Sequence, residues 1–222
     1  MCADVAKTLA DSLRITEIFY SLQGESHTVG WPTVFVRLTG CPLRCGYCDT
    51  SYAFQGGEWM LLDEVLAQVA GYRTRYVTVT GGEPLAQKTC IPFLVKLCDA
   101  GYEVSLETSG ALDIAEVDSR VCKVVDIKTP GSGEDRKNRW QNLECLTAQD
   151  QIKFVICDRA DYDWAKAILT QHQLDARCEV LFSPVFGRLE ARTLADWILQ
   201  DQLPVRFQLQ LHKILWGDEP GR

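Results

Sequence analysis

Three cysteines in the segment GCPLRCGYCDT, Cys41, Cys45 and Cys48, have the spacing C-x-x-x-C-x-x-C. Three thiolates this close together can hold one face of an iron–sulfur cluster, because Pro42 and the neighbouring glycines let the backbone fold around it. Zinc is the main alternative metal, but a structural zinc site usually takes four ligands, often as two C-x-x-C pairs. The sequence has no second pair, and its three histidines are far away along the chain. A cluster with three protein ligands leaves one iron free for a ligand that is not protein.

The other seven of the ten cysteines stand alone in the sequence. Several lie in apolar segments such as LVKLC and FVIC, where a thiol packs as a small hydrophobic group. In a reducing compartment, clustered thiols serve metals or catalysis more often than disulfides. We therefore expect structural roles for these seven: Cys2, Cys90, Cys98, Cys122, Cys145, Cys157 and Cys178.

Further chemically distinctive segments follow predicted strands. These are TGGEP at 80–84, ETSG at 107–110, KTPGSG at 128–133, SPVFG at 183–187 and LHK at 211–213. Taken alone, GGEP is typical of a turn and ETSG of a helix N-cap. In parallel α/β folds, however, ligands bind at the carboxyl ends of the strands, where the connecting loops converge. We therefore expect these segments and the cysteine loop to form one binding site.

Short runs rich in β-branched residues alternate with amphipathic stretches, which indicates strands separated by helices. We predict strands at 33–38, 76–80, 103–107, 123–127, 151–156, 179–182 and 205–210, an added N-terminal strand at 14–20, and helices at 61–70, 91–100, 162–171 and 193–200. Repeated β-α units imply parallel strands in a doubly wound sheet or a barrel. A complete barrel takes ~250 residues, so this shorter α/β chain, with a long cluster-binding loop at 39–59, favours an incomplete TIM-like β/α barrel of about six or seven parallel strands.

The composition predicts one domain over 1–222, because 46% hydrophobic residues are enough for one substantial core. A net charge of −7 argues against nucleic acid as a partner, since phosphate binding needs a basic face. We expect a small substrate. No apolar run approaches the ~20 residues that span a membrane, and the N-terminus has no apolar signal region, so we expect a cytoplasmic protein.

The cysteine motif after the first of the repeated strands, with Tyr47 directly before the third cysteine, resembles the signature of the radical S-adenosylmethionine superfamily. The resemblance implies a 4Fe-4S cluster on the three cysteines, whose open iron binds S-adenosylmethionine. It also implies that the GGE motif contacts the methionine amino group and that the ETSG segment contacts the ribose. Ser183-Pro184 stands where Gln-Pro is common. The implied cofactor contacts are Tyr47, Cys48, Asp49, Gly82, Glu83, Glu107, Ser109, Lys128, Thr129, Pro130, Ser183, Pro184, Val185 and Phe186.

A more specific resemblance covers IFYSLQGES and TVFVRLTGCPLRCGYCDT, which are similar to the 7-carboxy-7-deazaguanine synthase family. The resemblance extends over nearly the whole chain from residue 14, and it implies terminal extensions at 1–13 and 217–222. It implies a carbon–nitrogen lyase that converts 6-carboxy-5,6,7,8-tetrahydropterin to 7-carboxy-7-deazaguanine with release of ammonia, on the route to queuosine. It also implies a homodimer and flavodoxin or a similar reductant, and no catalytic residue beyond the cofactor-derived radical. The implied contacts are Thr50 to a magnesium ion, and Leu22, Gln23, Gly24, Arg37 and Thr80 to the pterin.

The main alternatives are another enzyme and a protein that is not an enzyme. A small activase that makes a glycyl radical on a partner protein would share the chain length and cysteine pattern, but Gln23, Gly24 and Arg37 favour the pterin enzyme. An electron carrier of the ferredoxin type, or a zinc-stabilised interaction module, would explain the cysteines alone. The GGEP segment and the full α/β pattern argue against both.

Overall fold

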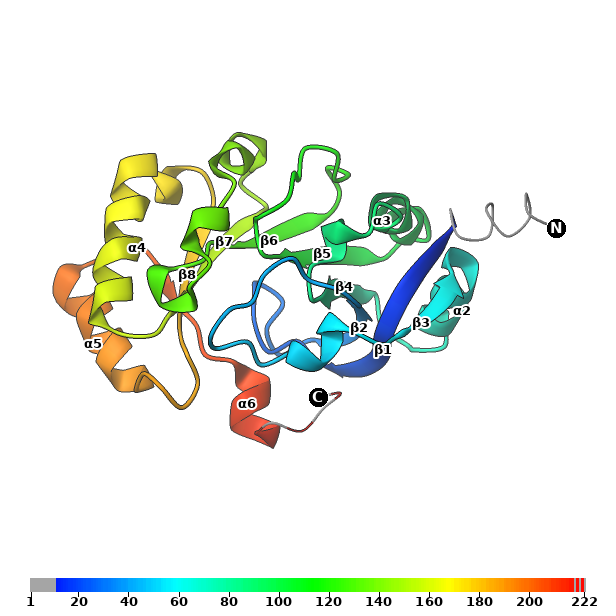
Figure 1. The fold of residues 1–222 in the computed structure, drawn as a ribbon, viewed down its shortest axis with the longest axis horizontal. Helices are drawn as coiled ribbons and strands as arrows, with labels where there is room; N and C mark the ends of the chain where they lie inside the picture. The colour runs from blue at the N-terminus through cyan, green and yellow to red at the C-terminus, as the bar shows by residue number, and fades with distance from the viewer. Residues whose placement is uncertain (1–10, 218, 220, 222) are drawn as a thin grey trace.

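The computed structural model describes residues 11–217, 219 and 221, and within them one nine-stranded sheet runs through the molecule (Figure 1). The strand order is β3-β1-β2-β4-β5-β6-β7-β8-β9. The strands are β1 (Ser12–Leu22), β2 (Pro32–Leu38), β3 (Glu58–Leu61), β4 (Tyr76–Gly81), β5 (Glu103–Thr108), β6 (Cys122–Asp126), β7 (Gln151–Ile156), β8 (Glu179–Pro184) and β9 (Arg206–Phe207).

The seven strands β2 and β4 to β9 pair in parallel, whereas β1 and β3 add antiparallel partners at one edge. The two end strands, β3 and β9, do not pair with each other, so the sheet is curved but not closed. The expected incomplete α/β barrel of the radical S-adenosylmethionine type is confirmed.

The helices are α2 (Leu62–Ala70), α3 (Cys90–Asp99), α4 (Arg159–His172), α5 (Ala191–Asp201) and α6 (Leu211–Trp216), with short 3₁₀ turns between them. The apolar residues of α2 recur at helical spacing, which places Leu62, Val65 and Val69 on one buried face. α4 begins where the Asp158 carboxylate accepts the Asp161 backbone N–H. No helix among the described residues is long and apolar enough to cross a membrane.

Strand residues alternate between the helix-covered core and the inside of the barrel. In β4, Val77 and Val79 belong to the apolar core, while Thr78 and Thr80 are also buried but outside it. This alternation is the period of two that every strand has. Because the interior positions near the strand ends carry hydroxyl and carboxyl groups, the barrel interior can hold a polar ligand.

Several predicted boundaries differ from the structure, among them those of the N-terminal extension, the cysteine loop and the last strand. β1 begins at Ser12 and Leu13 is fully buried, so the last residues of the supposed extension 1–13 belong to the sheet. The loop expected at 39–59 ends at Gly57, because β3 begins at Glu58. The strand expected at 205–210 is only Arg206–Phe207 long. Beyond it the Gln208 N–H still donates to the Phe182 carbonyl of β8, while the Gln208 side chain bonds the backbone N–H and carbonyl of Ser26.

Candidate active site

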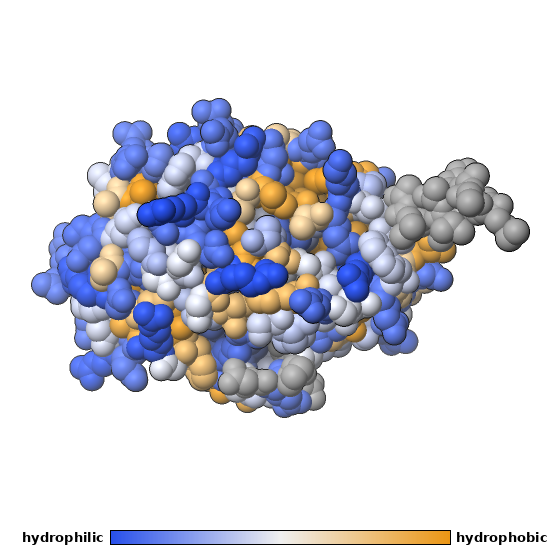
Figure 2. Space-filling view, viewed as in Figure 1, coloured by the Kyte–Doolittle hydropathy of each residue, from blue (hydrophilic) through white to orange (hydrophobic). Residues whose placement is uncertain are grey.

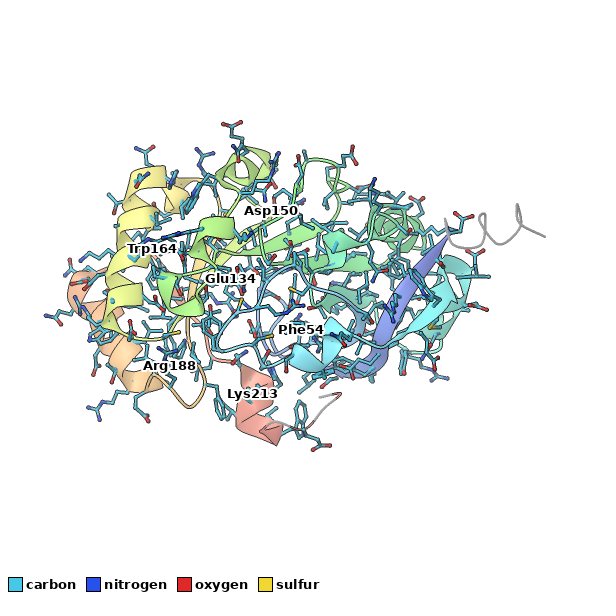
Figure 3. All side chains as sticks on the ribbon, in the orientation of Figure 1. Phe54, Glu134, Asp150, Trp164, Arg188 and Lys213 are labelled. Carbon is cyan, nitrogen blue, oxygen red and sulfur yellow. The ribbon has the colours of Figure 1, made fainter. Side chains whose placement is uncertain are left out.

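A cavity of about 350 Å³ opens at the carboxyl ends of the parallel strands. The cysteine loop, the ends of β4 to β6 and the segment before α6 surround it, so residues far apart in sequence meet there. Figure 3 labels two of its lining residues, Phe54 and Lys213. The predicted site residues that line it are Leu22, Gln23, Gly24, Arg37, Cys41, Cys45, Tyr47, Cys48, Asp49, Thr50, Thr80, Gly82, Glu107, Ser109, Lys128, Val185 and Phe186.

The cysteine loop is held against the strand ends by backbone hydrogen bonds. The Gly46 N–H donates to the Ser132 carbonyl at 3.0 Å, and the Glu83 N–H donates to the Gly40 carbonyl at 2.8 Å. A Cβ atom added to Gly82 would lie 2.3 Å from the Gly40 oxygen. Only glycine at this position lets the loop approach β4 so closely, which accounts for the GG pair in the motif.

The three loop thiols are half-buried and all line the cavity. Burial raises the pKa of Cys41 and raises that of Cys45 to about 11, so a bound metal centre would have to supply the positive charge that deprotonates them. Within residues 11–217, no three His, Cys, Asp or Glu side chains surround a position for one metal ion. Ligands of a four-iron cluster bind separate irons, so thiols spread around a cavity fit a cluster better than a single zinc ion.

Arg37 reaches the cavity from β2. Its Nε donates to Glu17 Oε1 at 2.7 Å, from the residue paired with it on β1, and Tyr52 donates to the same carboxylate oxygen at 2.8 Å. The side chain is 15% exposed. Within the described part of the chain, the terminal nitrogens of its guanidinium make no hydrogen bond, so the fork keeps donors for a carboxylate.

The turn after β1 and the ends of β4 and β5 form a connected polar group. Gln23 Nε2 donates to Thr78 Oγ1 at 2.9 Å, and its Oε1 accepts the Glu25 N–H at 3.1 Å. Thr80 donates to Glu107 Oε2 at 3.1 Å. Burial raises the pKa of Glu107, and the Glu25 charge raises it further. Glu107 was predicted at the ribose, and here it contacts predicted pterin residues.

Sequence reasoning missed a buried charge network in the same cavity. Lys153 Nζ lies 2.6 Å from Glu25 Oε2, and Lys128 Nζ lies 2.8 Å from Asp126 Oδ2. Burial alone would raise the pKa of Glu25, but Lys153 outweighs it and lowers the pKa to about 2. The signal was visible in the sequence, since a charged residue inside the apolar runs QIKFVI and KVVDI is costly to bury without a partner.

Asp126 carries an unused acceptor. Its Oδ2 faces Lys128, while its buried Oδ1 has no hydrogen-bond partner among the described residues. Buried polar atoms are almost always paired. Because Asp126 lines the cavity, an N–H or O–H group of a ligand can donate a hydrogen bond to Oδ1.

Glu83, predicted to contact the methionine amino group, does not line the cavity. It is completely buried, and its carboxylate accepts hydrogen bonds from the Ser109 N–H at 2.7 Å, from Thr108 Oγ1 at 2.9 Å and from the Leu85 N–H at 3.0 Å. Ser109 Oγ also bonds to it. In this structure Glu83 therefore fixes the end of β5 against the end of β4.

Four other predicted contacts also lie outside the cavity lining. Thr129 is buried and bonds the Val155 carbonyl at 3.2 Å, while Pro130 begins a 3₁₀ turn. Ser183 and Pro184 are buried at the end of β8. The SPVF segment reaches the cavity only through its last two residues.

The segment leading into α6, where the LHK segment was expected to join the site, covers the cavity beside the Gln23-Gly24 turn. The Leu211 N–H donates to the Gly24 carbonyl at 3.0 Å, and Gln210 Nε2 donates to Glu25 Oε1 at 2.9 Å. A Cβ on Gly24 would lie 2.2 Å from His212 Nδ1, so this contact requires glycine. Burial lowers the pKa of His212, which favours a neutral ring at the cavity.

Comparison with known proteins agrees with this geometry. Residues 35–126 match the radical SAM superfamily, which implies a 4Fe-4S cluster and S-adenosylmethionine. The chain is 46% identical over 210 residues to 7-carboxy-7-deazaguanine synthase of Chlorobaculum tepidum, covering 93% of this chain and 96% of that one. It is also 46% identical over 222 residues to the synthase of Koribacter versatilis, covering 93% and 98%.

Among solved structures, QueE from Escherichia coli superposes with a TM-score of 0.75 at 24% identity, over 90% of this chain and 95% of that one. This likeness supports the fold, and the sequence identity to the curated synthases decides the family. The chain belongs to the 7-carboxy-7-deazaguanine synthase family of radical SAM lyases.

Proposed function

We propose that this protein converts 6-carboxy-5,6,7,8-tetrahydropterin to 7-carboxy-7-deazaguanine with release of ammonia, as a step towards queuosine. The observation that carries the proposal is one cavity that combines three half-buried thiols with the free guanidinium edge of Arg37. The thiols suit a cluster, and the guanidinium suits the carboxylate of a small substrate. The names of the relatives support the same reaction and favour neither the activase nor the electron carrier.

The cofactor would occupy the side of the cavity next to the cysteine loop. Bound there, the cluster and S-adenosylmethionine supply the carbon radical that removes a hydrogen atom from the substrate. Cys41, Cys45 and Cys48 would hold the cluster. The close approach at Gly82 would shape the backbone beside the methionine group, and Asp126 Oδ1 would accept a ligand N–H or O–H group.

The substrate would occupy the side next to β1 and β2. Arg37 would receive its carboxylate, and the side chains of Gln23, Thr80 and Glu107 would meet the polar edge of the ring system. The stacked rings of Phe19 and Phe35, 4.9 Å apart, line the same side and suit a flat ring. The segment before α6 covers the cavity and would keep water away from the radical.

Magnesium would sit beside the cysteine loop. Thr50 donates to Asp49 Oδ1 at 2.8 Å, and both residues line the cavity. A hydroxyl and a carboxylate are hard oxygen ligands, which magnesium prefers, and substrate oxygens and water would complete the shell. The reductant, the homodimer and the cytoplasmic location stay predictions.

The test is an anaerobic assay of the reconstituted protein with the carboxypterin, S-adenosylmethionine and dithionite, with the product identified by mass spectrometry. We expect 7-carboxy-7-deazaguanine and ammonia in equal amounts. Cys45→Ala should lose the cluster absorbance and the product, while Cys98→Ser should keep both, because Cys98 lies on α3 away from the cavity. Cofactor cleavage without the deazaguanine product would keep the superfamily and reject the substrate.

A further inference from the structure

Asp161 is a buried carboxylate that holds the loop after β6 from outside the cavity. It lies in the first turn of α4 and is 1% exposed. Its Oδ1 accepts the Gly131 N–H at 2.7 Å, while its Oδ2 accepts the Thr129 hydroxyl at 2.9 Å and the Cys157 N–H at 3.1 Å. Such donors offset the cost of burying a carboxylate. Helix α4 therefore fixes the positions of Thr129 and Gly131.

The approach of this loop to α4 requires glycine at position 131. A Cβ atom added to Gly131 would clash with the Asp161 carboxylate. The loop closes into a turn, because the Thr129 carbonyl accepts the Ser132 N–H at 3.0 Å and the Ser132 hydroxyl at 2.6 Å. The distinctive segment KTPGSG therefore serves a contact within the protein at Thr129 and Gly131.

The same turn, residues 129–134, holds the peptide groups on both sides of Cys45. The Ser132 carbonyl accepts the Gly46 N–H at 3.0 Å. Glu134 Oε1 accepts the Arg44 N–H at 2.6 Å, and the Glu134 N–H donates to Ser132 Oγ at 3.0 Å. The two contacts are thus coupled to each other. Because a peptide group that is paired in this way cannot turn freely, the turn fixes the backbone that carries the Cys45 thiol.

We propose that Asp161 is a positioning residue for the reaction, because the turn that it holds keeps Cys45 in place to bind the cluster. Asp161 itself does not line the cavity and acts only through the 129–134 turn. Residues that hold a metal ligand in place contribute to the affinity for the metal although they do not touch it. The proposal rests on the proposed function, since the position of Cys45 matters to the reaction only if this thiol binds the cluster.

The first measurement is the release of iron from the reconstituted protein to a chelator, without turnover. In Asp161→Asn one acceptor oxygen becomes an NH₂ group, which would face an N–H or O–H donor of the turn or of Cys157. The turn should therefore loosen. We expect iron release about tenfold faster than in the wild type, because removing a group that holds a metal ligand typically costs roughly 10- to 100-fold in metal affinity.

Asp150→Asn is the matched control. Asp150 is also 1% exposed, and it likewise accepts two backbone N–H groups and a threonine hydroxyl, from Lys123 and Thr147. It pairs in addition with Lys123 Nζ at 3.1 Å. It directly precedes β7, at the end of the barrel away from the cysteine loop. Asp150→Asn should therefore lower the unfolding free energy of the apoprotein at least as much as Asp161→Asn, yet leave iron release within about twofold of wild type.

Glu134 tests the other end of the turn from the protein surface. Its side chain is half-buried, and Figure 3 labels it on the face where Figure 2 shows many hydrophilic side chains, so it can be replaced without opening the core. Glu134→Ala removes a carboxylate and frees the Arg44 N–H. Both changes favour the more negative, reduced cluster, so the reduction potential should rise.

An anaerobic redox titration followed by electron paramagnetic resonance measures this potential. Glu144→Ala is the control, because Glu144 is exposed on the 3₁₀ turn Trp140–Cys145, outside the cavity lining, and its loss makes the same change of charge. It should leave the potential at the wild-type value. If Asp161→Asn does not fold, this second pair of variants decides alone.

The outcomes separate the positioning role from the proposed function. A wild type that binds no cluster would reject the cluster assignment and with it the proposed function. A wild type that binds the cluster and makes no deazaguanine would reject the substrate and leave the role of Asp161 standing. Equal iron release in Asp161→Asn and Asp150→Asn would overturn the positioning role, since Asp161 would then contribute only to stability. Equal potentials in Glu134→Ala and Glu144→Ala would also overturn it.

Discussion

Replacing Arg37 by lysine should separate substrate binding from cofactor binding. The change keeps the positive charge next to Glu17, whose carboxylate lies 2.7 Å from Arg37 Nε. It removes the planar fork, so one compact ammonium must serve both Glu17 and the substrate carboxylate. S-adenosylmethionine would bind on the other side of the cavity, beside the cysteine loop, and should be little affected.

The size of the effect follows from the contacts of Arg37. Its side chain is only 15% exposed, so solvent would screen little of an interaction made there. Losing one charge-assisted hydrogen bond costs about 1.5–3 kcal/mol. Since about 1.4 kcal/mol is a factor of ten in an equilibrium constant, the dissociation constant of the pterin should rise roughly 10- to 100-fold.

The assay is anaerobic calorimetry of the reconstituted protein with each ligand in turn, with the iron content of the variant checked first. Arg120→Lys is the control, because Arg120 pairs with Asp99 and Asp118 away from the cavity and should leave both ligands unaffected. Equal weakening of the pterin and of S-adenosylmethionine in Arg37→Lys would show that Arg37 supports the fold. Unchanged pterin binding would remove it from the substrate site.

Three further predictions concern other parts of the cavity. Thr50→Ala should raise the magnesium concentration needed for half-maximal turnover and leave the cluster spectrum unchanged, while Thr50→Ser should restore the wild-type dependence. Glu83→Gln should lower the free energy of unfolding of the apoprotein by about 1–3 kcal/mol in a urea titration, because the carboxylate that bonds Ser109 is lost; no loss would contradict its bracing role. The pKa of Glu25 is lowered to about 2 beside Lys153, so its contribution to stability is present above pH 4.5 and is lost as the pH falls toward 2. The gap in unfolding free energy between wild type and Glu25→Gln should therefore narrow across that window, and a constant gap in urea titrations would refute the pairing.

The local pattern of the sequence was enough to predict most of the sheet and four of the five α-helices found among the described residues. The runs of β-branched residues and the amphipathic spacing are properties of neighbouring residues, so they survive whatever the chain packs against. The cysteine spacing is equally local, and for that reason it indicated a cluster loop directly. The short helix α6 was missed because a six-residue helix has little periodicity to detect.

The tertiary structure decided which polar residues share the cavity. Glu83 belongs to a glycine-rich motif whose family resemblance implied a ligand contact, yet Thr108 and Ser109 at the end of β5 bind its carboxylate in the interior. Lys153 and Glu25 are 128 residues apart and meet only because β7 and the turn after β1 face the same barrel interior. Residue types and spacing determine what chemistry a segment can do. Burial and pairing across the sheet depend on contacts that are distant in sequence. They determine whether a charged group is paired with another group of the protein or is free to bind a ligand.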